Sequence, residues 1–412
     1  MRICFLLKRF PALSQTFILH QITDLIDKGH DVSIVSLYQP LREKQHNDVA
    51  AYNLPAKTHY TGMPRHRLKR LLKALWLVLR YLPRAPFAIV HALNIIAYGR
   101  EVRALKLLYL VVFFLRQPEV LEADVLHCHF GPVAVVGQLA KELLGASVPL
   151  VATFHGTDMG GYVQRHGLKE YRLLFARCGS YTVNTRFSRE RLVKLGAPKE
   201  RITIIPAGLR PERFGPGEKQ PGNKPLQLIT VARLVYGKGL GYAMGAMKEL
   251  QRRGRDFTYL LVGDGPMLGV LHALVDKLGL GETVSFYGAA DQEEVRRQLA
   301  RADVFLLPSI ALPDGSQETQ GLVLQEAQAG GLPVIATRIG GIAEGMRHQH
   351  TGLLVAEKDS QAIADAVGFF IDRPQAVQDM GRAGQKWARE HYDIRSLNER
   401  LLRLYKGLRA TV

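Results

Sequence analysis

The chain is poor in cysteine and contains no long apolar run. Its 412 residues include three cysteines, Cys4, Cys128 and Cys178. An odd, scattered set of this kind argues against a disulfide framework and fits a reducing compartment. No uninterrupted apolar run approaches the roughly 18 residues that a membrane-spanning helix needs. The first apolar run, residues 3–7, is too short for a signal peptide, so we expect a buried strand there.

Two ligand-binding motifs are also missing. No Gly-x-Gly-x-x-Gly follows the first apolar run, so binding of a nicotinamide dinucleotide is not supported. No Asp-x-Asp occurs anywhere in the chain. Enzymes that hold a diphosphate through a divalent cation usually need such a pair of carboxylates, so we expect neither a metal nor a cofactor.

Acidic side chains are scarce in the first half of the chain. Residues 1–205 hold 29 Lys and Arg against 14 Asp and Glu, a net charge of +15, whereas residues 206–412 hold 26 against 23, a net charge of +3. Residues 58–116 alone contain 11 basic side chains and one acidic side chain, Glu101. A basic stretch of this size implies an anionic partner, either nucleic acid or a membrane surface rich in anionic lipid.

The same basic stretch is rich in apolar side chains. Apolar runs lie beside Lys and Arg at four places: 71–72, 74–79, 87–90 and 107–115. This combination fits amphipathic helices that lie in a membrane interface, with Trp76 and Leu77 available for insertion. The alternative is that these helices pack against the core and show a basic face to water. Nucleic acid is disfavoured because aromatic residues do not alternate regularly with the basic ones.

Apolar runs alternate with helix-length segments along the whole chain. Strands are expected at 3–7, 32–37, 125–128, 149–154, 180–184, 202–205, 226–232, 259–262, 284–287, 304–307, 334–336 and 353–355. Strands of parallel sheets are continuously apolar because helices cover both faces. The sequence therefore predicts an α/β protein with two Rossmann-like, doubly wound sheets. A stretch rich in Pro, Gly and charge, residues 206–225, predicts the boundary between them.

Two cations follow the strand that we expect at residues 226–232. Arg233 comes directly after this run, and Lys238 lies in the glycine-bearing turn that follows. Ligands of doubly wound sheets bind outside the carboxyl ends of the strands. A guanidinium and an ammonium at such a place are suited to neutralising a diphosphate.

Two carboxylates, Glu318 and Glu326, lie eight positions apart, the first in a predicted loop and the second on the helix after it. At 1.5 Å per residue they would be about 12 Å apart in a fully helical stretch. That distance is close to the length from nucleotide to sugar in a nucleotide sugar. The positive N-terminal end of the helix, near Gln320, would suit a phosphate.

In order and spacing these motifs resemble the donor-binding half of a retaining family-4 glycosyltransferase of the GT-B fold. The matching motifs are Arg-x4-Lys-Gly at 233–239, Gly-Asp-Gly-Pro at 263–266, Phe-x-Gly at 286–288, Glu-x7-Glu at 318–326, Gly-x-Pro-Val-Ile at 331–335 and Gly-Gly-x-x-Glu at 340–344. The N-terminal half matches more loosely, at 10–18, 127–131 and 153–158. The opening motif is similar to that of transferases that build colanic acid and related bacterial exopolysaccharides.

The resemblance implies a hexosyltransferase that moves a sugar, with retention, from a nucleoside-diphosphate sugar to a polyprenyl-linked oligosaccharide. It assigns the departing diphosphate to Arg233 and Lys238, the donor sugar's hydroxyls to Glu318, and the ribose to Glu326. We expect Lys238 and Glu318 on exposed loops. The further donor-binding positions that it implies are Gly263, Asp264, Gly265, Gly321 and Leu322.

The resemblance also assigns residues of the first half. His155 would bind the transferred sugar and would be catalytic together with the diphosphate cations and Glu318. His129 and Asp158 would lie on the acceptor side. A metal held by His127 and His129 is the alternative, but His-x-His alone lacks the three or four ligands that zinc sites use.

The resemblance divides the chain into an acceptor-side domain at 1–205, a donor-binding domain at 206–390 and a C-terminal helix at 391–412 that returns to the first domain. The two domains are expected to face each other across a cleft. The expected partners are the nucleotide sugar, the lipid-linked acceptor and, through residues 58–116, the anionic cytoplasmic surface of the inner membrane. Nucleic acid is not expected.

Two alternatives remain open. One is another GT-B enzyme, such as a nucleotide-sugar epimerase or a synthase of the glycogen or sucrose type. The other, from a different class, is a protein that binds nucleic acid or another anionic polymer through the +15 domain.

Overall fold

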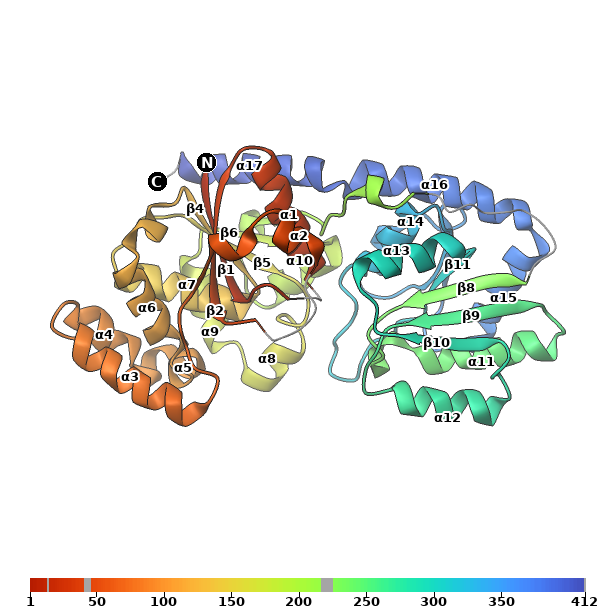
Figure 1. The fold of residues 1–412 in the computed structure, drawn as a ribbon, viewed down its shortest axis with the longest axis horizontal. Coiled ribbons are helices and arrows are strands. Elements are labelled where there is room, and N and C mark those ends of the chain that lie inside the picture. Colours follow the sequence, from red (N-terminus) through yellow and green to blue (C-terminus); the bar gives the residue numbers. More distant parts are fainter. Residues whose placement is uncertain (13–14, 41–45, 216–224, 411–412) are drawn as a thin grey trace. The chain divides into compact units, whose positions relative to one another are not determined.

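The structure is a computed structural model that describes residues 1–12, 15–40, 46–215 and 225–410. The chain divides into two compact units: residues 1–205 together with 397–412, and residues 206–396. Each unit contains a sheet flanked by helices (Figure 1). Ser14 of the opening motif and residues 216–224 of the predicted boundary lie outside the described residues.

The first unit is built on a seven-stranded sheet in the order β3-β2-β1-β4-β5-β6-β7. The strands are β1 (Arg2–Arg9), β2 (Asp31–Tyr38), β3 (Thr58–Tyr60), β4 (Val125–His129), β5 (Leu150–Phe154), β6 (Ser180–Val183) and β7 (Ile202–Ile204). Every neighbouring pair is parallel. Strands β4, β5 and β6 are buried along their whole length, because helices cover both faces of the sheet.

Helices of the first unit form more than one layer over this sheet. They are α1 (Thr16–Asp27), α2 (Asn47–Ala51), α3 (Arg67–Tyr81), α4 (Pro86–Ala92), α5 (Ile95–Arg103), α6 (Lys106–Arg116), α7 (Gly131–Leu143), α8 (Gly161–His166), α9 (Lys169–Arg177) and α10 (Arg186–Lys194). Helix α7 packs on β1, β4 and β5, and α6 packs on α7. Residues 107–114 of α6 are all buried, so this apolar run belongs to the core.

The second unit is built on a six-stranded parallel sheet in the order β10-β9-β8-β11-β12-β13. The strands are β8 (Leu226–Val231), β9 (Phe257–Val262), β10 (Val284–Gly288), β11 (Val304–Leu307), β12 (Val334–Thr337) and β13 (Gly352–Val355). The helices are α11 (Leu240–Arg252), α12 (Leu268–Leu278), α13 (Gln292–Arg301), α14 (Leu322–Ala329), α15 (Ser360–Asp372) and α16 (Pro374–Tyr392).

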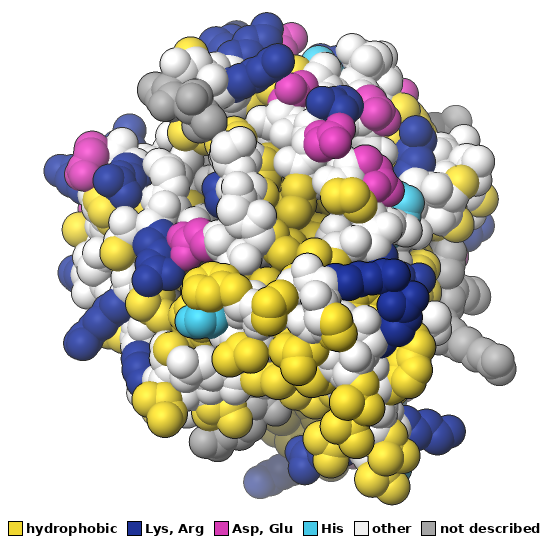
Figure 2. Space-filling model, turned by 90° about the vertical axis from the view of Figure 1, so that its left-hand side faces the viewer, with side chains coloured by type: hydrophobic (Ala, Val, Ile, Leu, Met, Phe, Trp, Pro, Cys, Tyr) yellow, Lys and Arg dark blue, Asp and Glu magenta, His cyan; other side chains and the backbone are white. Residues whose placement is uncertain are grey.

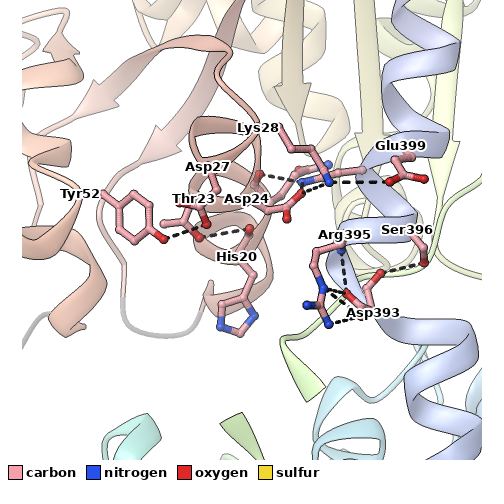
Figure 3. A network of polar contacts seen from close by, with 12 residues as sticks. His20, Thr23, Asp24, Asp27, Lys28, Tyr52, Asp393, Arg395, Ser396 and Glu399 are labelled. Carbon is pink, nitrogen blue, oxygen red and sulfur yellow. Dashed lines mark hydrogen bonds and ion pairs between the residues drawn. The ribbon is translucent and has the colours of Figure 1, made fainter. Parts of the chain in front are cut away.

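The last helix, α17 (Ile394–Arg409), contributes residues from Leu397 onward to the first unit. Leu401 and Tyr405 are buried in a core cluster of that unit. Polar contacts with the C-terminal end of α1 add to this packing, as Figure 3 shows. Lys28 Nζ lies 3.8 Å from a carboxylate oxygen of Asp24 on α1 and 3.8 Å from one of Glu399 on α17.

All twelve predicted strands are present, with ends that differ by at most two residues. The prediction of an α/β protein with two parallel sheets is therefore confirmed. One strand was missed, β3 (Thr58–Tyr60), which pairs only with β2 at the edge of the first sheet. Its sequence, Thr-His-Tyr, is not an apolar run, because an edge strand does not have to be covered on every side.

Candidate active site

In the second unit the strand order reverses next to β8. Strand β9 follows on one side, whereas the later strand β11 lies on the other. A switch point of this kind leaves a crevice at the carboxyl ends of the two strands, where ligands of such sheets bind. The loop after β8 carries Arg233 and Lys238, and the segment after β11 leads to Glu318.

A glycine brings these two loops together. Gly239, directly after Lys238, has a φ of 64°, and a Cβ at this position would lie 1.9 Å from the carbonyl oxygen of Pro308. Only glycine can occupy such a position without a shift of the backbone. The amide of Ile310 also donates to the carbonyl of Gly237 across 2.9 Å. The Lys-Gly pair of the motif therefore holds Lys238 against the loop that follows β11.

Lys238 and Glu318 form an ion pair between Nζ and Oε2. Their side chains are only 20% and 24% exposed. The expectation that both residues lie on exposed loops is therefore wrong, because the two loops pack on each other. A cation and a carboxylate held together at a switch point can each turn to a bound molecule, the ammonium to a phosphate and the carboxylate to a hydroxyl.

The Gly263-Asp264-Gly265 loop lies against the same loop as Arg233. The amide of Leu234 donates to the carbonyl of Asp264 across 2.9 Å. A Cβ on Gly263, whose φ is 140°, would lie 1.9 Å from the carbonyl oxygen of Ala232. The glycine thus allows the loops after β8 and β9 to meet, while the side chains of Arg233 and Asp264 stay exposed.

The second glycine motif holds the backbone of Glu318. The amide of Gly341 donates to the carbonyl of Glu318 across 2.9 Å. Gly340 has a φ of 49°, and a Cβ there would lie 2.1 Å from the same carbonyl oxygen. Its amide donates to Oε1 of Gln317 across 3.0 Å. Gly340 and Gly341 therefore position Glu318, a role that the sequence analysis did not assign to them.

Helix α14 carries the second carboxylate, Glu326. The helix begins at Leu322, after Gly321 in the left-handed conformation with a φ of 74°. Glu326 is 8% exposed, and burial raises the pKa of its carboxyl to about 7. Glu326 is therefore largely inside the unit, four positions into the helix.

Gln320 is tied into the fold and does not open the helix N-terminus to a ligand. Its amide group donates to and accepts from the backbone of Ala207, both across 2.8 Å, and only 3% of the residue is exposed. The helix begins two residues later than the position that we considered for a phosphate. The sequence could not show this contact, because the partner is 113 positions away.

In the first unit, His155 directly follows β5 and pairs with His129 at the end of β4. Nε2 of His155 lies 2.9 Å from Nδ1 of His129, and the two rings are stacked with centroids 5.1 Å apart. The ring of His127 also stacks on that of His129, with centroids 4.4 Å apart. Burial lowers the pKa of His155 to about 3 and that of His129 well below its usual value, so both rings are neutral at pH 7.

Asp158 fixes the loop that carries His155. Its carboxylate accepts from the amides of Gly131, His155 and Gly156 at 3.0, 3.1 and 2.8 Å. Burial nevertheless raises the pKa of the carboxyl, against the opposing effect of these hydrogen bonds. Asp158 is 2% exposed, so its first role in the structure is to join two strand ends.

A cationic cavity of about 410 Å³ lies beside this loop in the first unit. Three cations line it: Lys8 after the apolar part of β1, Lys106 at the start of α6, and Arg165 on α8. Asp158 and Tyr162 are part of the wall. Sequence reasoning missed these cations, because three different segments bring them together.

No group of three or more His, Cys, Asp and Glu suited to hold a metal occurs among the residues that the structure describes. His127 in particular is engaged elsewhere: its Nδ1 lies 2.5 Å from the Tyr405 hydroxyl and its Nε2 lies 2.6 Å from Oγ1 of Thr153. Both ring nitrogens that could bind a metal thus have protein partners.

Two parallel-sheet α/β units with candidate ligand loops after the strand ends define the GT-B class of glycosyltransferase folds. Solved structures of this class match the whole chain. HepE of Anabaena, in complex with UDP-glucose, has a TM-score of 0.73 at 18% identity and is covered over 100% of its length by 99% of this chain. Sucrose-phosphate synthase of Thermosynechococcus elongatus has a TM-score of 0.75 at 18% identity, with 100% of both chains covered.

Comparison of sequences identifies the family of this chain more narrowly than the fold does. Residues 105–213 match the model of Glycosyltransferase Family 4, and residues 216–387 match that of Glycosyl transferases group 1. Over 99% of its length the chain is 35% identical to the whole of the putative colanic acid biosynthesis glycosyltransferase WcaL of Salmonella typhimurium. It is 33% identical to the amylovoran biosynthesis glycosyltransferase AmsK of Erwinia amylovora, over 88% of this chain and 89% of that one. The chain belongs to the family-4 glycosyltransferases with a group 1 domain, and the predicted family is confirmed.

Proposed function

We propose that this glycosyltransferase moves a hexosyl group from a nucleoside-diphosphate sugar to a lipid-linked oligosaccharide during bacterial exopolysaccharide biosynthesis, with retention at the anomeric carbon. The observation that carries the proposal is the ion pair of Lys238 and Glu318 at the switch point of the second sheet. A cation that can bind phosphate and a carboxylate that can bind hydroxyls lie side by side in this pair. WcaL and AmsK, the relatives in colanic acid and amylovoran biosynthesis, support the pathway class.

In this mechanism the cations act on the leaving group. Arg233 and Lys238 would stabilise the negative charge that develops on the diphosphate as the sugar–phosphate bond breaks. No metal is needed in this proposal, since two side-chain charges take its place. The departing phosphate would accept the proton of the acceptor hydroxyl that attacks from the same face, which gives retention.

The carboxylates and His155 orient the donor. Once Lys238 turns to the phosphate, Glu318 is available to accept hydrogen bonds from the sugar hydroxyls, and Glu326 would accept from the ribose. The neutral ring of His155 would hydrogen-bond the transferred sugar without adding another positive charge. Gly263, Gly265 and Gly321 would let the backbone approach the donor closely.

The acceptor would use the cationic cavity of the first unit. Lys8, Lys106 and Arg165 line about 410 Å³ of space, enough for a phosphate or diphosphate group with part of a sugar. A saccharide linked to a lipid by phosphate carries that charge at its reducing end, so the cavity would hold the phosphate of a short oligosaccharide whose free end is the acceptor. Such an acceptor requires the enzyme to work at the cytoplasmic face of the inner membrane.

Donor binding can be tested by thermal shift with a panel of nucleoside-diphosphate sugars. The panel needs both uridine and guanosine donors, because HepE binds UDP-glucose and a relative in Mycolicibacterium smegmatis, 31% identical over 301 residues, is GDP-mannose-dependent. A donor at 100 times its Kd should stabilise the protein by about 2.7 kcal/mol. Lys238→Ala should abolish the shift, whereas Lys248→Ala on α11 should keep it. A panel in which no member binds would contradict the proposal.

The acceptor cavity has its own test. Lys106→Gln together with Arg165→Gln should raise the KM for a polyprenyl-diphosphate-linked acceptor by about ten-fold or more while the donor-induced shift stays unchanged. Arg172→Gln, an exposed change on α9 of the same unit, is the matched control. An unchanged acceptor KM in the double variant would remove the cavity from the proposal.

A further inference from the structure

Helix α3 has apolar side chains on two opposite faces. Ala74, Leu77 and Tyr81 are buried on the face that packs into the unit. The other face carries a stripe of side chains that are each 57–68% exposed: Leu68, Leu71, Leu72, Leu75, Trp76 and Leu79. This spacing of three and four residues places all six on one side of the helix. The expectation that Leu77 is available for insertion is wrong, because Leu77 is 3% exposed and belongs to the core.

The exposed stripe continues onto the next two helices. Helix α3 packs on α4, where Phe87 and Val90 are 63% and 57% exposed, and Ile96 on α5 is 87% exposed. Of the fifteen large hydrophobic side chains exposed among the described residues, twelve fall within residues 68–96. We call these twelve side chains the apolar patch: the six of the α3 stripe with Leu82, Phe87, Val90, Leu93, Ile95 and Ile96. Figure 2 shows hydrophobic side chains gathered over the lower part of this face, with Lys and Arg beside them.

Cations border the apolar patch. Exposed Arg67 lies on one side of the α3 stripe, and exposed Lys69 and Arg80 lie on the other. Arg84 is exposed in the turn that leads to α4. Residues 49–100 contain no Asp or Glu. The alternative that these helices show only a basic face to water is therefore wrong for α3 and α4, whose water-facing side is apolar with a basic border.

We propose that the apolar patch inserts into the headgroup region of an anionic lipid bilayer, with α3 lying in the plane of the membrane. An apolar face with a border of Lys and Arg and an exposed tryptophan is the pattern of helices that lie in a membrane interface. Burial of the leucines supplies a nonpolar contribution, and the border attracts anionic headgroups. Among the described residues, no helix has the length and hydropathy that a membrane-spanning helix requires.

A second copy of this chain fits the apolar patch less well. In a twofold dimer the same surface meets itself, so the border of Arg67, Lys69, Arg80 and Arg84 would face its own positive charges. With no carboxylate in residues 49–100, nothing within that segment would offset the repulsion. An anionic bilayer complements both the apolar centre and the basic border.

This membrane contact rests on the proposed function, because a lipid-linked acceptor is the reason for the enzyme to bind a bilayer. The apolar patch itself is observed independently of that function. It names the helices that would hold the enzyme at the acceptor's membrane. Vesicle binding can be measured without donor or acceptor, so a failure of one proposal is distinguishable from a failure of the other.

The first experiment is flotation of the full chain with vesicles of phosphatidylcholine alone and of equal parts phosphatidylcholine and phosphatidylglycerol. We expect binding to the anionic vesicles and a loss of about ten-fold or more in Trp76→Glu with Leu79→Glu. Val270→Glu on α12 is the matched control, because Val270 is 57% exposed, as Trp76 is. The donor-induced thermal shift should be the same in all of these proteins.

A variant that removes charge separates the contribution of the basic border to vesicle binding from that of the apolar patch. Arg67, Lys69, Arg80 and Arg84, all changed to Gln, should weaken binding to anionic vesicles and reduce its salt dependence. Arg70 and Lys73 are left in place, because their side chains donate to the carbonyls of Pro64 and Gly62 and hold the local fold.

Tryptophan fluorescence locates the contact. The chain has two tryptophans, Trp76 and Trp387, so Trp387→Phe leaves Trp76 as the only indole. Its emission should shift to the blue with anionic vesicles and be quenched by lipids brominated on their acyl chains. Three results would overturn the inference. The emission of Trp76 could stay unchanged with anionic vesicles, or the Trp76→Glu, Leu79→Glu variant could float with them as the parent does. The third result is a stable dimer of the parent that dissociates in this double variant.

Discussion

At the residue scale, the proposed chemistry depends on Lys238 and Glu318, which neutralise each other while each is about a fifth to a quarter exposed. A partly buried pair interacts more strongly than one at an open surface. Removing one partner leaves the other charge partly buried and unpaired, which destabilises the fold. The same ion pair therefore stabilises these two loops and holds the two side chains that we expect to bind the ligand.

Lys238→Ala and Glu318→Ala should each lower kcat/KM by two or more orders of magnitude, because removal of one preorganised group costs about 2.7–4 kcal/mol of transition-state stabilisation. Each single variant should also melt slightly earlier than the parent. The double variant should regain most of that stability while staying inactive, which separates the catalytic effect from the structural one. Near-normal turnover in either single variant would show that its assigned role is wrong.

Glu326→Gln should stabilise the protein at pH 8 and leave it almost unchanged at pH 4. The folded pKa, about 7, lies above the usual value of 4.5, so stability is lost as pH rises from about 4.5 to 7. The gain at pH 8 can reach about 3 kcal/mol. Urea unfolding at the two pH values measures it, with exposed Glu282→Gln as the control. If Glu326 binds the ribose, donor affinity should fall in the same variant; equal gains at both pH values would contradict the buried-carboxylate explanation.

At the scale of elements, the close approach of loops through glycine sets the geometry of the candidate site. A carbonyl oxygen lies close to each of Gly239, Gly263 and Gly340. A Cβ added to any of these glycines would lie 2.1 Å or less from that oxygen. In each case the neighbouring loop carries or positions a predicted donor residue. The glycines of the motifs thus act on the site through backbone packing as well as through any contact with the donor.

Gly340→Ala should reduce kcat/KM by about ten-fold or more, because the new methyl group pushes away the carbonyl of Glu318. Gly279→Ala is a matched control: Gly279 also has a positive φ, 63°, but nothing lies within 4 Å of its added Cβ. Both variants carry the strain of a positive φ, about 1 kcal/mol by chemical denaturation, and Gly340→Ala should lose further stability through its contact with the carbonyl of Glu318, so activity is compared per folded molecule. Equal activity in the two would show that Gly340 does not position Glu318.

The elements themselves were largely predictable, whereas their contacts were not. Buried strands of a parallel sheet can be recognised in the sequence as apolar runs. Among the described strands, only the edge strand β3 was not predicted. Arg233, Lys238 and Glu318 could be singled out because they follow such runs in a known order of motifs. The ion pair, the contact of Gln320 with Ala207 and the cavity cations join residues far apart in the chain, and no local pattern encodes them.

At the scale of the whole molecule, the charge asymmetry matches a division of labour between the two halves of the chain. The first half, at +15, contains the cationic cavity and the apolar patch, whereas the second, at +3, contains the loops to which we assign the donor. The assignment of the donor site to residues 206–390 and of acceptor binding to residues 1–205 remains part of the proposal. A protein that binds nucleic acid through its basic half is disfavoured, because family membership shows a glycosyltransferase.

In the proposed reaction, side-chain cations take the place of a metal when the sugar leaves its nucleotide. The most direct measurement is the rate of transfer to a polyprenyl-diphosphate-linked acceptor, with the donor that the panel identifies, in excess EDTA. We expect the same turnover with EDTA as with added Mg²⁺ or Mn²⁺, because Arg233 and Lys238 would neutralise the diphosphate. Turnover that disappears in EDTA and returns only on adding a divalent cation would contradict it.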